Sequence, residues 1–112
     1  MLDHERLDVY QRSIEFVAVA VKIIETFPRG HGGLIDQLRR AAISIPLNIA
    51  EGSGRPSGAD RARFRAIARG SAMECAAILD VCGVLGQVEP DLLAAGKGLL
   101  VRIVSMLTKM CR

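Results

Sequence analysis

The polar residues best placed to do chemistry in this sequence form one row. Gln37, Arg40, Ser44, Asn48 and Glu51 are spaced three or four residues apart, so on a helix they would share a face. An unpaired polar group costs about 1–3 kcal/mol when it is buried, so a buried row would need a partner for every member. A solvated row would carry no such requirement.

If the row is buried, the sequence offers partners for it. Arg40, Asn48 and Glu51 could form a network with Glu74 and with an arginine of the next helix. Such a network would specify how the helices pair and would perform no catalysis. We therefore interpret these four residues as a structural polar network, in which Arg40, Asn48 and Glu51 are at least partly buried and bonded across helices.

A second candidate site is an excess of arginine in the middle of the chain. Residues 39–69 contain seven arginines and two acids, whereas the whole chain has a net charge of only +3. Such an excess can mark a nucleic-acid-binding surface, although a solvated helix surface is the commoner explanation. Because residues four apart share a helix face, Arg61, Arg65 and Arg69 should form a stripe, with Arg55 in the preceding turn. We predict that these four arginines contact nucleic-acid phosphates.

The same arginines also have a structural interpretation. Arg63 is turned away from the stripe, and Arg61 and Arg65 could pair with acids of a neighbouring helix or subunit, such as Glu15 or Glu25. Only 4% of the residues are aromatic, so few rings are present on which bases could stack. The alternative to a nucleic-acid-binding protein is therefore a structural or protein-interaction module whose charge is incidental.

No pattern in the sequence indicates catalysis, a cofactor or a metal ion. His4 and His31 have no Cys, Asp or His at ligand spacing, and no Glu-x-x-His or His-Glu-x-x-His motif is present. The glycine-rich residues 52–58 follow a helix and lack the Lys-Ser/Thr of a nucleotide-binding loop. Their backbone donors, beside Arg55, could still bind a nucleic-acid phosphate. We expect a protein that is not an enzyme and that needs no cofactor.

The cysteines and the hydropathy pattern indicate a compartment. Cys75 and Cys82 would lie about 10 Å apart along a helix, which is too far for a disulfide, and with Cys111 they make an odd number. Free thiols of this kind fit a reducing compartment. No apolar stretch approaches the ~20 residues of a membrane-spanning helix, and no signal peptide opens the chain. We expect a cytoplasmic protein without membrane contact.

Four helices in one domain, residues 1–112, must position these side chains. Apolar residues recur at helical spacing, and the alternation typical of strands does not appear. The pattern predicts helices over residues 3–27, 34–51, 59–87 and 90–111. Helices joined by loops this short pack as an antiparallel, up-down-up-down four-helix bundle, so the predicted fold class is all-α.

Local signals refine the ends and the course of these helices. The first should end at Pro28, and Pro46 predicts a kink inside the second. Gly52 is expected to end the second helix in a left-handed conformation. Ser57 and Asp60 resemble a capping box that starts the third helix, with Asp in place of Glu.

The first and third helices carry more apolar surface than one small bundle can bury. The first has a heptad-like row and a second row beside it: Leu7, Tyr10, Ile14, Val17, Val21 and Ile24, then Val9, Phe16, Ala20, Ile23 and Phe27. The third has a row beyond its core row: Met73, Ala77, Val81 and Val84. Gly70, beside the core row, would let a neighbouring backbone come close. Long exposed apolar rows usually become interfaces, so we expect self-association.

Three blocks of the sequence resemble a known bacterial family. Residues 37–55, QLRRAAISIPLNIAEGSGR, closely resemble the signature of a four-helix-bundle family whose members include proteins encoded within intervening sequences of 23S ribosomal RNA genes. Residues 7–11, LDVYQ, are similar to the opening block of that family, with Tyr10 where the family usually has Trp. Residues 64–74, FRAIARGSAME, resemble its third-helix block.

The resemblance implies a fold and partners, and it implies no active site. It implies an antiparallel four-helix bundle, a ring of five subunits and no enzymatic activity. A related protein is the accessory protein of diversity-generating retroelements, a basic pentamer that works with a reverse transcriptase and nucleic acid. On this basis we expect a homopentamer, with RNA or DNA and a reverse transcriptase or another protein as candidate partners.

Overall fold

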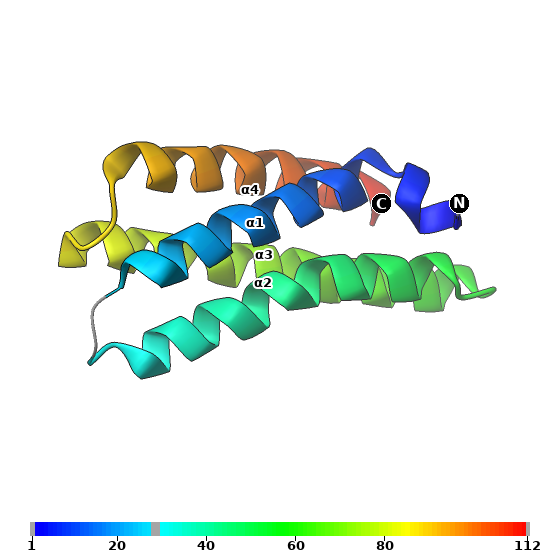
Figure 1. Ribbon diagram of the computed structural model, residues 1–112. Coiled ribbons are helices and arrows are strands. Elements are labelled where there is room, and N and C mark those ends of the chain that lie inside the picture. The colour runs from blue at the N-terminus through cyan, green and yellow to red at the C-terminus, as the bar shows by residue number, and fades with distance from the viewer. Residues whose placement is uncertain (1, 28–29, 112) are drawn as a thin grey trace.

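The structure, a computed structural model, describes residues 2–27 and 30–111 and is built from helices. In chain order they are η1 (Asp3–Arg6, a 3-10 helix), α1 (Asp8–Thr26), α2 (Gly32–Ser53), α3 (Gly58–Leu85) and α4 (Pro90–Met110). The four long helices alternate in direction (Figure 1), and the described ranges contain no strand. The predicted antiparallel four-helix bundle is confirmed. Pro28, the predicted end of the first helix, lies outside the described residues.

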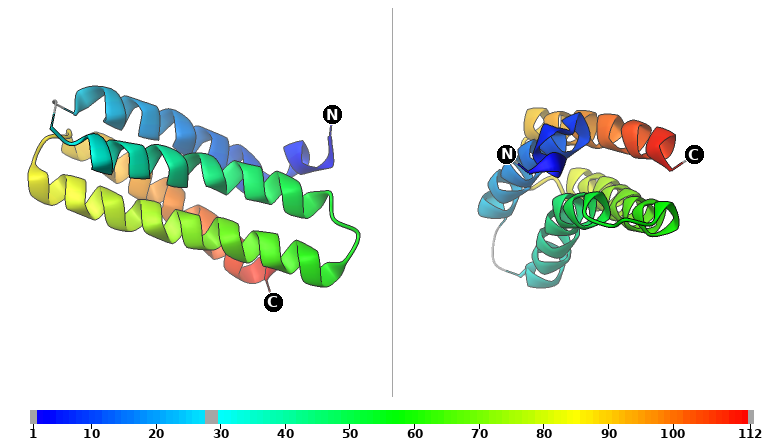
Figure 2. Two further views of the ribbon diagram at one scale, coloured as in Figure 1. Left: turned by 90° about the horizontal axis from the view of Figure 1, so that it is seen from below. Right: turned by 90° about the vertical axis from the view of Figure 1, so that its right-hand side faces the viewer.

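The four long helices form two layers of two. Helix α1 lies with α4, and α2 lies with α3, and each helix contacts two others around the bundle: α1 contacts α2 and α4, and α3 contacts α2 and α4 (Figure 2). The α2–α3 turn and both ends of the chain lie at the same end of the bundle (Figure 1). Within the described part of the chain, none of the helices combines the length and apolarity needed to cross a membrane.

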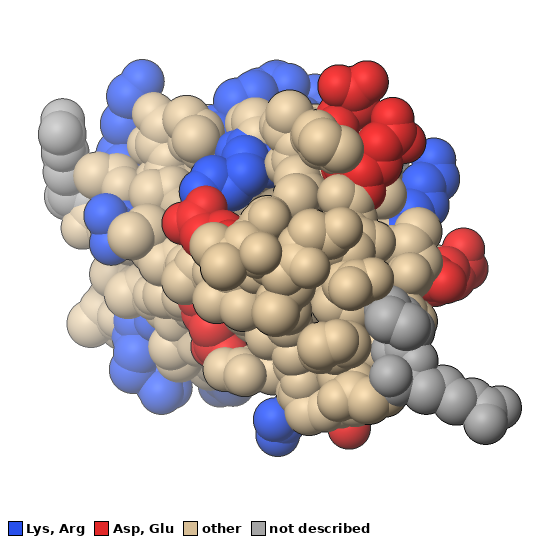
Figure 3. All heavy atoms as spheres, turned by 90° about the vertical axis from the view of Figure 1, so that its left-hand side faces the viewer, with Lys and Arg blue, Asp and Glu red and all other residues tan. Residues whose placement is uncertain are grey.

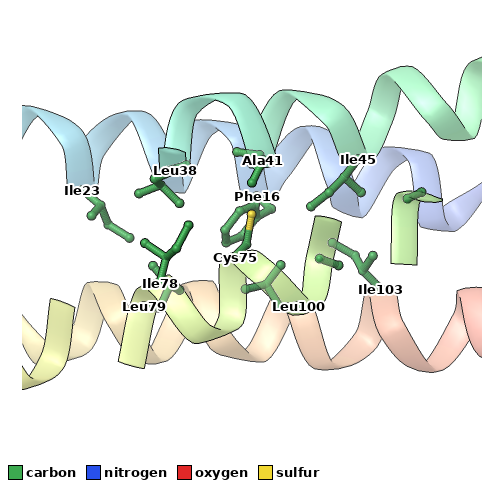
Figure 4. Packing of buried hydrophobic residues seen from close by; sticks show 14 of the residues in the cluster. Phe16, Ile23, Leu38, Ala41, Ile45, Cys75, Ile78, Leu79, Leu100 and Ile103 are labelled. Atoms are coloured by element: carbon green, nitrogen blue, oxygen red, sulfur yellow. The ribbon is translucent and has the colours of Figure 1, made fainter. Parts of the chain in front are cut away.

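The core is centred on Phe16, whose side chain is fully buried. Figure 4 shows its ring beside Ala41, Cys75 and Leu100, which come from α2, α3 and α4 respectively. Most of the other buried residues are aliphatic or small, so the helices can approach closely around this one ring. A single large side chain therefore fills the space that the four helices share.

The heptad-like row of α1 is not its core row. The buried residues of α1 belong mainly to the second row: Val9, Ser13, Phe16, Ala20 and Ile23. Ile14 and Val21, from the heptad-like row, are 46% and 47% exposed. Both rows are apolar, so spacing alone could not select one. The second row contains Phe16, and burying it fills the bundle centre.

The roles of the glycines differ from those predicted for Gly52 and Gly70. Gly52 does not take a left-handed conformation; it lies inside α2, is buried, and a Cβ there would be 3.1 Å from Cβ of Phe64 on α3. Gly86, with φ +70°, ends α3 in the left-handed conformation instead. Gly70 has no atom within 4 Å of its would-be Cβ in the described chain, so no close neighbour explains it here.

The remaining local signals agree with the structure. Helix α2 continues through Pro46 and changes direction near its middle (Figure 1), in agreement with the expected kink. The Ser57 hydroxyl accepts a hydrogen bond from the Asp60 N–H at 3.4 Å and caps α3. The Asp60 carboxylate lies 3.9 Å from the Arg63 guanidinium, so it pairs with a side chain of its own helix.

Gly96 is a buried glycine of α4 that lies against side chains of α1 and α3. A Cβ at Gly96 would lie 2.9 Å from Cδ1 of Leu79, 3.3 Å from Cγ1 of Val19 and 3.5 Å from Cε1 of Phe16. A glycine inside a helix costs about 1 kcal/mol relative to alanine, so Gly96 alone would weaken the fourth helix. The structure shows the opposite role, because only a residue without a side chain lets α4 pack against α1 and α3 at this depth.

Gly96→Val should lower the free energy of unfolding by about 1–3 kcal/mol, because the added methyl groups overpack the contact with Leu79, Val19 and Phe16. Urea unfolding followed by circular dichroism measures this loss. Gly98→Val is the matched control, since no described atom lies within 4 Å of a Cβ there, and its effect should stay within about 0.5 kcal/mol. Equal effects of the two substitutions would contradict the close packing at Gly96.

Candidate functional site

The polar row of α2 faces α3 and forms an open hollow with it. The hollow has a volume of about 360 Å³ and is lined by Gln37, Arg40, Ala41, Ser44, Ser71 and Glu74. Two hydrogen bonds cross it: Gln37 Nε2 donates to Glu74 Oε2 at 3.3 Å, and the Ser71 hydroxyl donates to the Ser44 hydroxyl at 2.8 Å. The row therefore does bond across helices, through its glutamine and its serine.

The residues predicted to carry the network lie around these two bonds. Asn48 is half-buried, and its Nδ2 donates to the carbonyl and the hydroxyl of Ser44 at 2.8 and 2.9 Å, within α2. Glu51 is exposed and lies 3.3 Å from Arg55. Arg40 is exposed at the edge of the hollow. Glu74, also exposed, is the one member of the predicted set that is bonded across helices.

Side-chain length explains why Ser44, and neither Arg40 nor Glu51, forms a hydrogen bond between α2 and α3. The Ser44 and Ser71 side chains are short and half-buried, so their hydroxyls meet where the two helix backbones approach. Arg40 and Glu51 are long, and their charged ends extend towards water from the margin of the contact. The sequence signal covered one half of the serine pair, since Ser44 lies in the polar row, whereas Ser71 was not among the predicted partners.

The predicted arginines lie at the end of the bundle that holds the α2–α3 turn. Arg61 folds back onto this turn, and its Nη1 donates to the carbonyls of Arg55 and Pro56 at 3.1 and 2.8 Å. Arg69 Nε donates to Thr108 Oγ1 on α4 at 2.8 Å. Two members of the stripe are thus partly engaged with the protein itself, and each keeps further guanidinium N–H groups.

Two other arginines surround Phe64 near the start of α3. The guanidinium carbons of Arg55 and Arg63 lie 4.9 and 4.6 Å from the centre of the Phe64 ring, which is cation–π distance. Arg55 also lies 3.3 Å from Glu51. Arg63, which the sequence places off the stripe, therefore joins Arg55 around one ring. These contacts hold two cationic groups beside an exposed turn.

The predicted pairing of Arg61 or Arg65 with distant acids does not occur among the residues that the structure describes. Glu15 lies 2.8 Å from Arg12 on its own helix. Arg65 is half-buried and forms no ion pair with any described residue. Pairing with acids of a neighbouring subunit stays a prediction.

Charge is unevenly distributed along α3. Its first twelve residues, 58–69, contain four arginines and one acid, whereas residues 70–85 contain only the acids Glu74 and Asp80. One end of the bundle is basic as a consequence.

The described residues contain no arrangement suited to a metal ion or to thiol chemistry. No three His, Cys, Asp or Glu side chains among them lie close enough to hold a metal ion. Burial raises the pKa of the Cys75 thiol to about 12, with a further contribution from the charge of Glu74. Burial also raises the pKa of Cys82. Both thiols stay neutral near pH 7 and are poor nucleophiles.

Comparisons with known proteins give a family and a fold. Residues 5–109 match the family model described as 23S rRNA-intervening sequence protein. A crystal structure of a protein of unknown function from the S23 ribosomal protein family of Bacteroides thetaiotaomicron is similar, with a TM-score of 0.85 and 21% sequence identity. The similarity covers 93% of this chain and 98% of that one. No curated protein matches the sequence significantly.

Ser44→Ala should lower the free energy of unfolding by about 1–2 kcal/mol, because the hydroxyl accepts hydrogen bonds from both Ser71 and Asn48. Asn48→Ala should have a smaller effect in the same direction, because both hydrogen bonds of Asn48 stay within α2 and join no second helix. Arg40→Ala, at an exposed position of the same row, is the control and should change stability by less than about 0.5 kcal/mol. Thermal unfolding of the three variants checks this ranking, which an unchanged Ser44→Ala variant would contradict.

Proposed function

The chain belongs to the 23S rRNA-intervening sequence protein family, and from this premise we propose that it is a non-enzymatic, homo-oligomeric protein that binds nucleic acid through the basic end of its bundle. The observation that supports the proposal most is the uneven charge of α3, which gathers four arginines and one acid in its first twelve residues. A phosphate backbone is the anionic partner that such a surface suits.

The proposed contacts are Arg55, Arg61, Arg65 and Arg69. Arg55 and Arg65 are partly exposed, and Arg61 and Arg69 each commit one nitrogen to the protein and keep others for a ligand. Guanidinium groups bind phosphate oxygens in pairs of hydrogen bonds. Phe64, the aromatic ring at this end of α3, lies against two arginines. Binding should therefore use phosphates and depend little on base sequence.

Self-association would strengthen weak contacts of this kind. Identical subunits in a ring present the same basic end several times, so one nucleic-acid strand could engage several copies. The number five comes from the family resemblance, as does a reverse transcriptase or another protein as partner. Free, buried thiols fit a reducing compartment such as the cytoplasm.

The alternative function is a protein-interaction module without a nucleic-acid role. The observation that favours it is the amount of apolar surface left uncovered on α1, α2 and α3. On this alternative, the arginines would serve solubility and the turn structure, as the bonds of Arg61 to two backbone carbonyls already do. Binding measurements separate the two functions.

The variant Arg55→Gln/Arg65→Gln should bind generic duplex DNA or RNA at least tenfold more weakly than the unmodified chain at low salt. If each side chain neutralises one phosphate, the slope of log affinity against log salt should become shallower by up to about 2 per chain. Fluorescence anisotropy at several salt concentrations measures both effects.

The control for this experiment is Lys22→Gln/Arg40→Gln, which removes the same charge from exposed positions in the other half of the bundle. It should keep most of the affinity and the steeper slope. Absence of binding by the unmodified chain at low salt would refute the nucleic-acid role. Equal losses in both variants would refute the basic end as its location.

Light scattering at micromolar concentration should show an assembly larger than one chain, because the apolar faces of α1, α2 and α3 are uncovered in a single copy. A mass of five chains would match the family resemblance. A dimer or tetramer would contradict only the predicted number of five subunits. A monomer would refute self-association altogether.

A further inference from the structure

The tyrosine and phenylalanine rings of this chain already have partners within the protein. The chain has one tyrosine and three phenylalanines, and all four lie within the described residues. Phe16 is fully buried at the bundle centre. Tyr10 is half-buried, and its ring meets that of His4 edge to face, with 4.7 Å between the ring centres. Phe27, also half-buried, meets His31 in the same way at 5.5 Å. None of these three rings is an open platform on which a base could stack.

Phe64, the fourth ring, lies among the arginines near the start of α3 and is surrounded by protein groups. It is half-buried. The guanidinium carbons of Arg55 and Arg63 lie 4.9 and 4.6 Å from the centre of its ring. Helix α2 packs against the base of the same side chain, since a Cβ at Gly52 would lie 3.1 Å from Cβ of Phe64. A base that stacked on Phe64 would therefore have to displace an arginine from its cation–π contact.

The arginine side chains at this end of the bundle are held by the protein before any ligand binds. Arg61 donates to two backbone carbonyls of the α2–α3 turn, at 3.1 and 2.8 Å. Arg69 donates to Thr108 at 2.8 Å, and Arg55 lies 3.3 Å from Glu51. Binding costs the entropy of ordering long side chains, so this array needs less ordering than free arginines would. A fixed array of cations suits a ligand whose phosphates are also fixed.

A duplex is the nucleic acid whose phosphates are both fixed and dense. Duplex DNA is stiff over about 150 bp, whereas a flexible single strand has to be ordered when it binds. A duplex also carries one charge per ~1.7 Å of its axis, which is twice the charge density of either strand. Phosphates within about 10 Å attract cations without direct contact. Fixed arginines therefore attract a duplex more strongly than a single strand.

We propose that the basic end of the bundle binds the phosphate backbone of duplex nucleic acid in preference to a single strand, and that no base stacks on the protein. This inference rests on the proposed function and adds the form of nucleic acid that is bound. Proteins that hold single strands combine a basic groove with aromatic rings, and each stacked base contributes roughly 5- to 150-fold in affinity. The rings of this chain are buried or half-buried and in contact with other groups, so a single strand binds without that contribution.

Three DNA probes of equal length test which form is bound. They are a non-self-complementary strand of about 20 nucleotides, longer than the sites that single-strand binding folds cover, the duplex of that strand, and an abasic sugar-phosphate strand. At equal salt, the duplex should bind the unmodified chain at least about fivefold more tightly than the base-bearing strand, and the abasic strand should bind within about twofold of the base-bearing one. Fluorescence anisotropy measures the three affinities.

Each probe also supplies a result that would overturn the inference. A smaller advantage of the duplex would overturn the preference, and a larger loss with the abasic strand would show that bases do stack. Either result would leave nucleic-acid binding itself standing. Absence of binding to all three probes would refute the proposed function, and this inference with it.

The variant Phe64→Leu removes the ring and keeps an apolar side chain at a half-buried position. Because no base stacks on Phe64, the affinities for the single strand and for the duplex should change by the same factor, within about twofold. Phe27→Leu is the matched control: it removes a ring that follows the end of α1 away from the α2–α3 turn (Figure 1), and it should leave both affinities unchanged. Circular dichroism checks that both variants keep their helices. A loss in Phe64→Leu that is larger for the single strand would contradict the inference.

Discussion

The rotation of α1 about its own axis determines most of the other features of this bundle. It is fixed by Phe16, which lies at the shared centre of the four helices, and by the absence of a side chain at Gly96, which lets α4 approach Phe16. With Phe16 pointing inward, Ile14 and Val21 must point outward. An apolar groove between α1 and α2 results directly from how the core is filled. Helix α1 carries two apolar rows and can bury only one of them.

The sequence was sufficient to predict the helices, because their signals are local. The start of α3 at Ser57, the position of Pro46 inside α2, and Pro90 at the start of α4 follow from capping and proline chemistry between near neighbours. The choice between the two rows of α1 could not be predicted, since it depends on contacts with residues about 25 to 80 positions away. The role of Gly96 escaped prediction for the same reason.

The candidate site, like the fold, could be predicted from the sequence only in part. The helical spacing of Arg61, Arg65 and Arg69 followed from the sequence, and so did the common face of the polar row. Which of these side chains is free did not follow. Arg61 turns towards backbone carbonyls, and Arg69 reaches Thr108 on another helix. Ser44 of the polar row and Ser71 of α3 make the contact between helices that long charged residues were expected to make. The hydrogen-bond partners of these side chains depend on side-chain length and on crowding around each residue. Residue spacing in the sequence reports neither of these.

The end of the bundle without the α2–α3 turn shows a broad uncharged area with charged groups around it (Figure 3).

The arrangement of contacts around the bundle also bears on how the chain folds. Three of the four helix pairs, α1–α2, α2–α3 and α3–α4, join consecutive helices through short turns, and only α1–α4 brings distant segments together. Closing short loops costs little entropy, and chains dominated by such contacts fold within microseconds to milliseconds. The central hairpin of α2 and α3 needs neither end of the chain, whereas the α1–α4 seam forms only once both ends have docked.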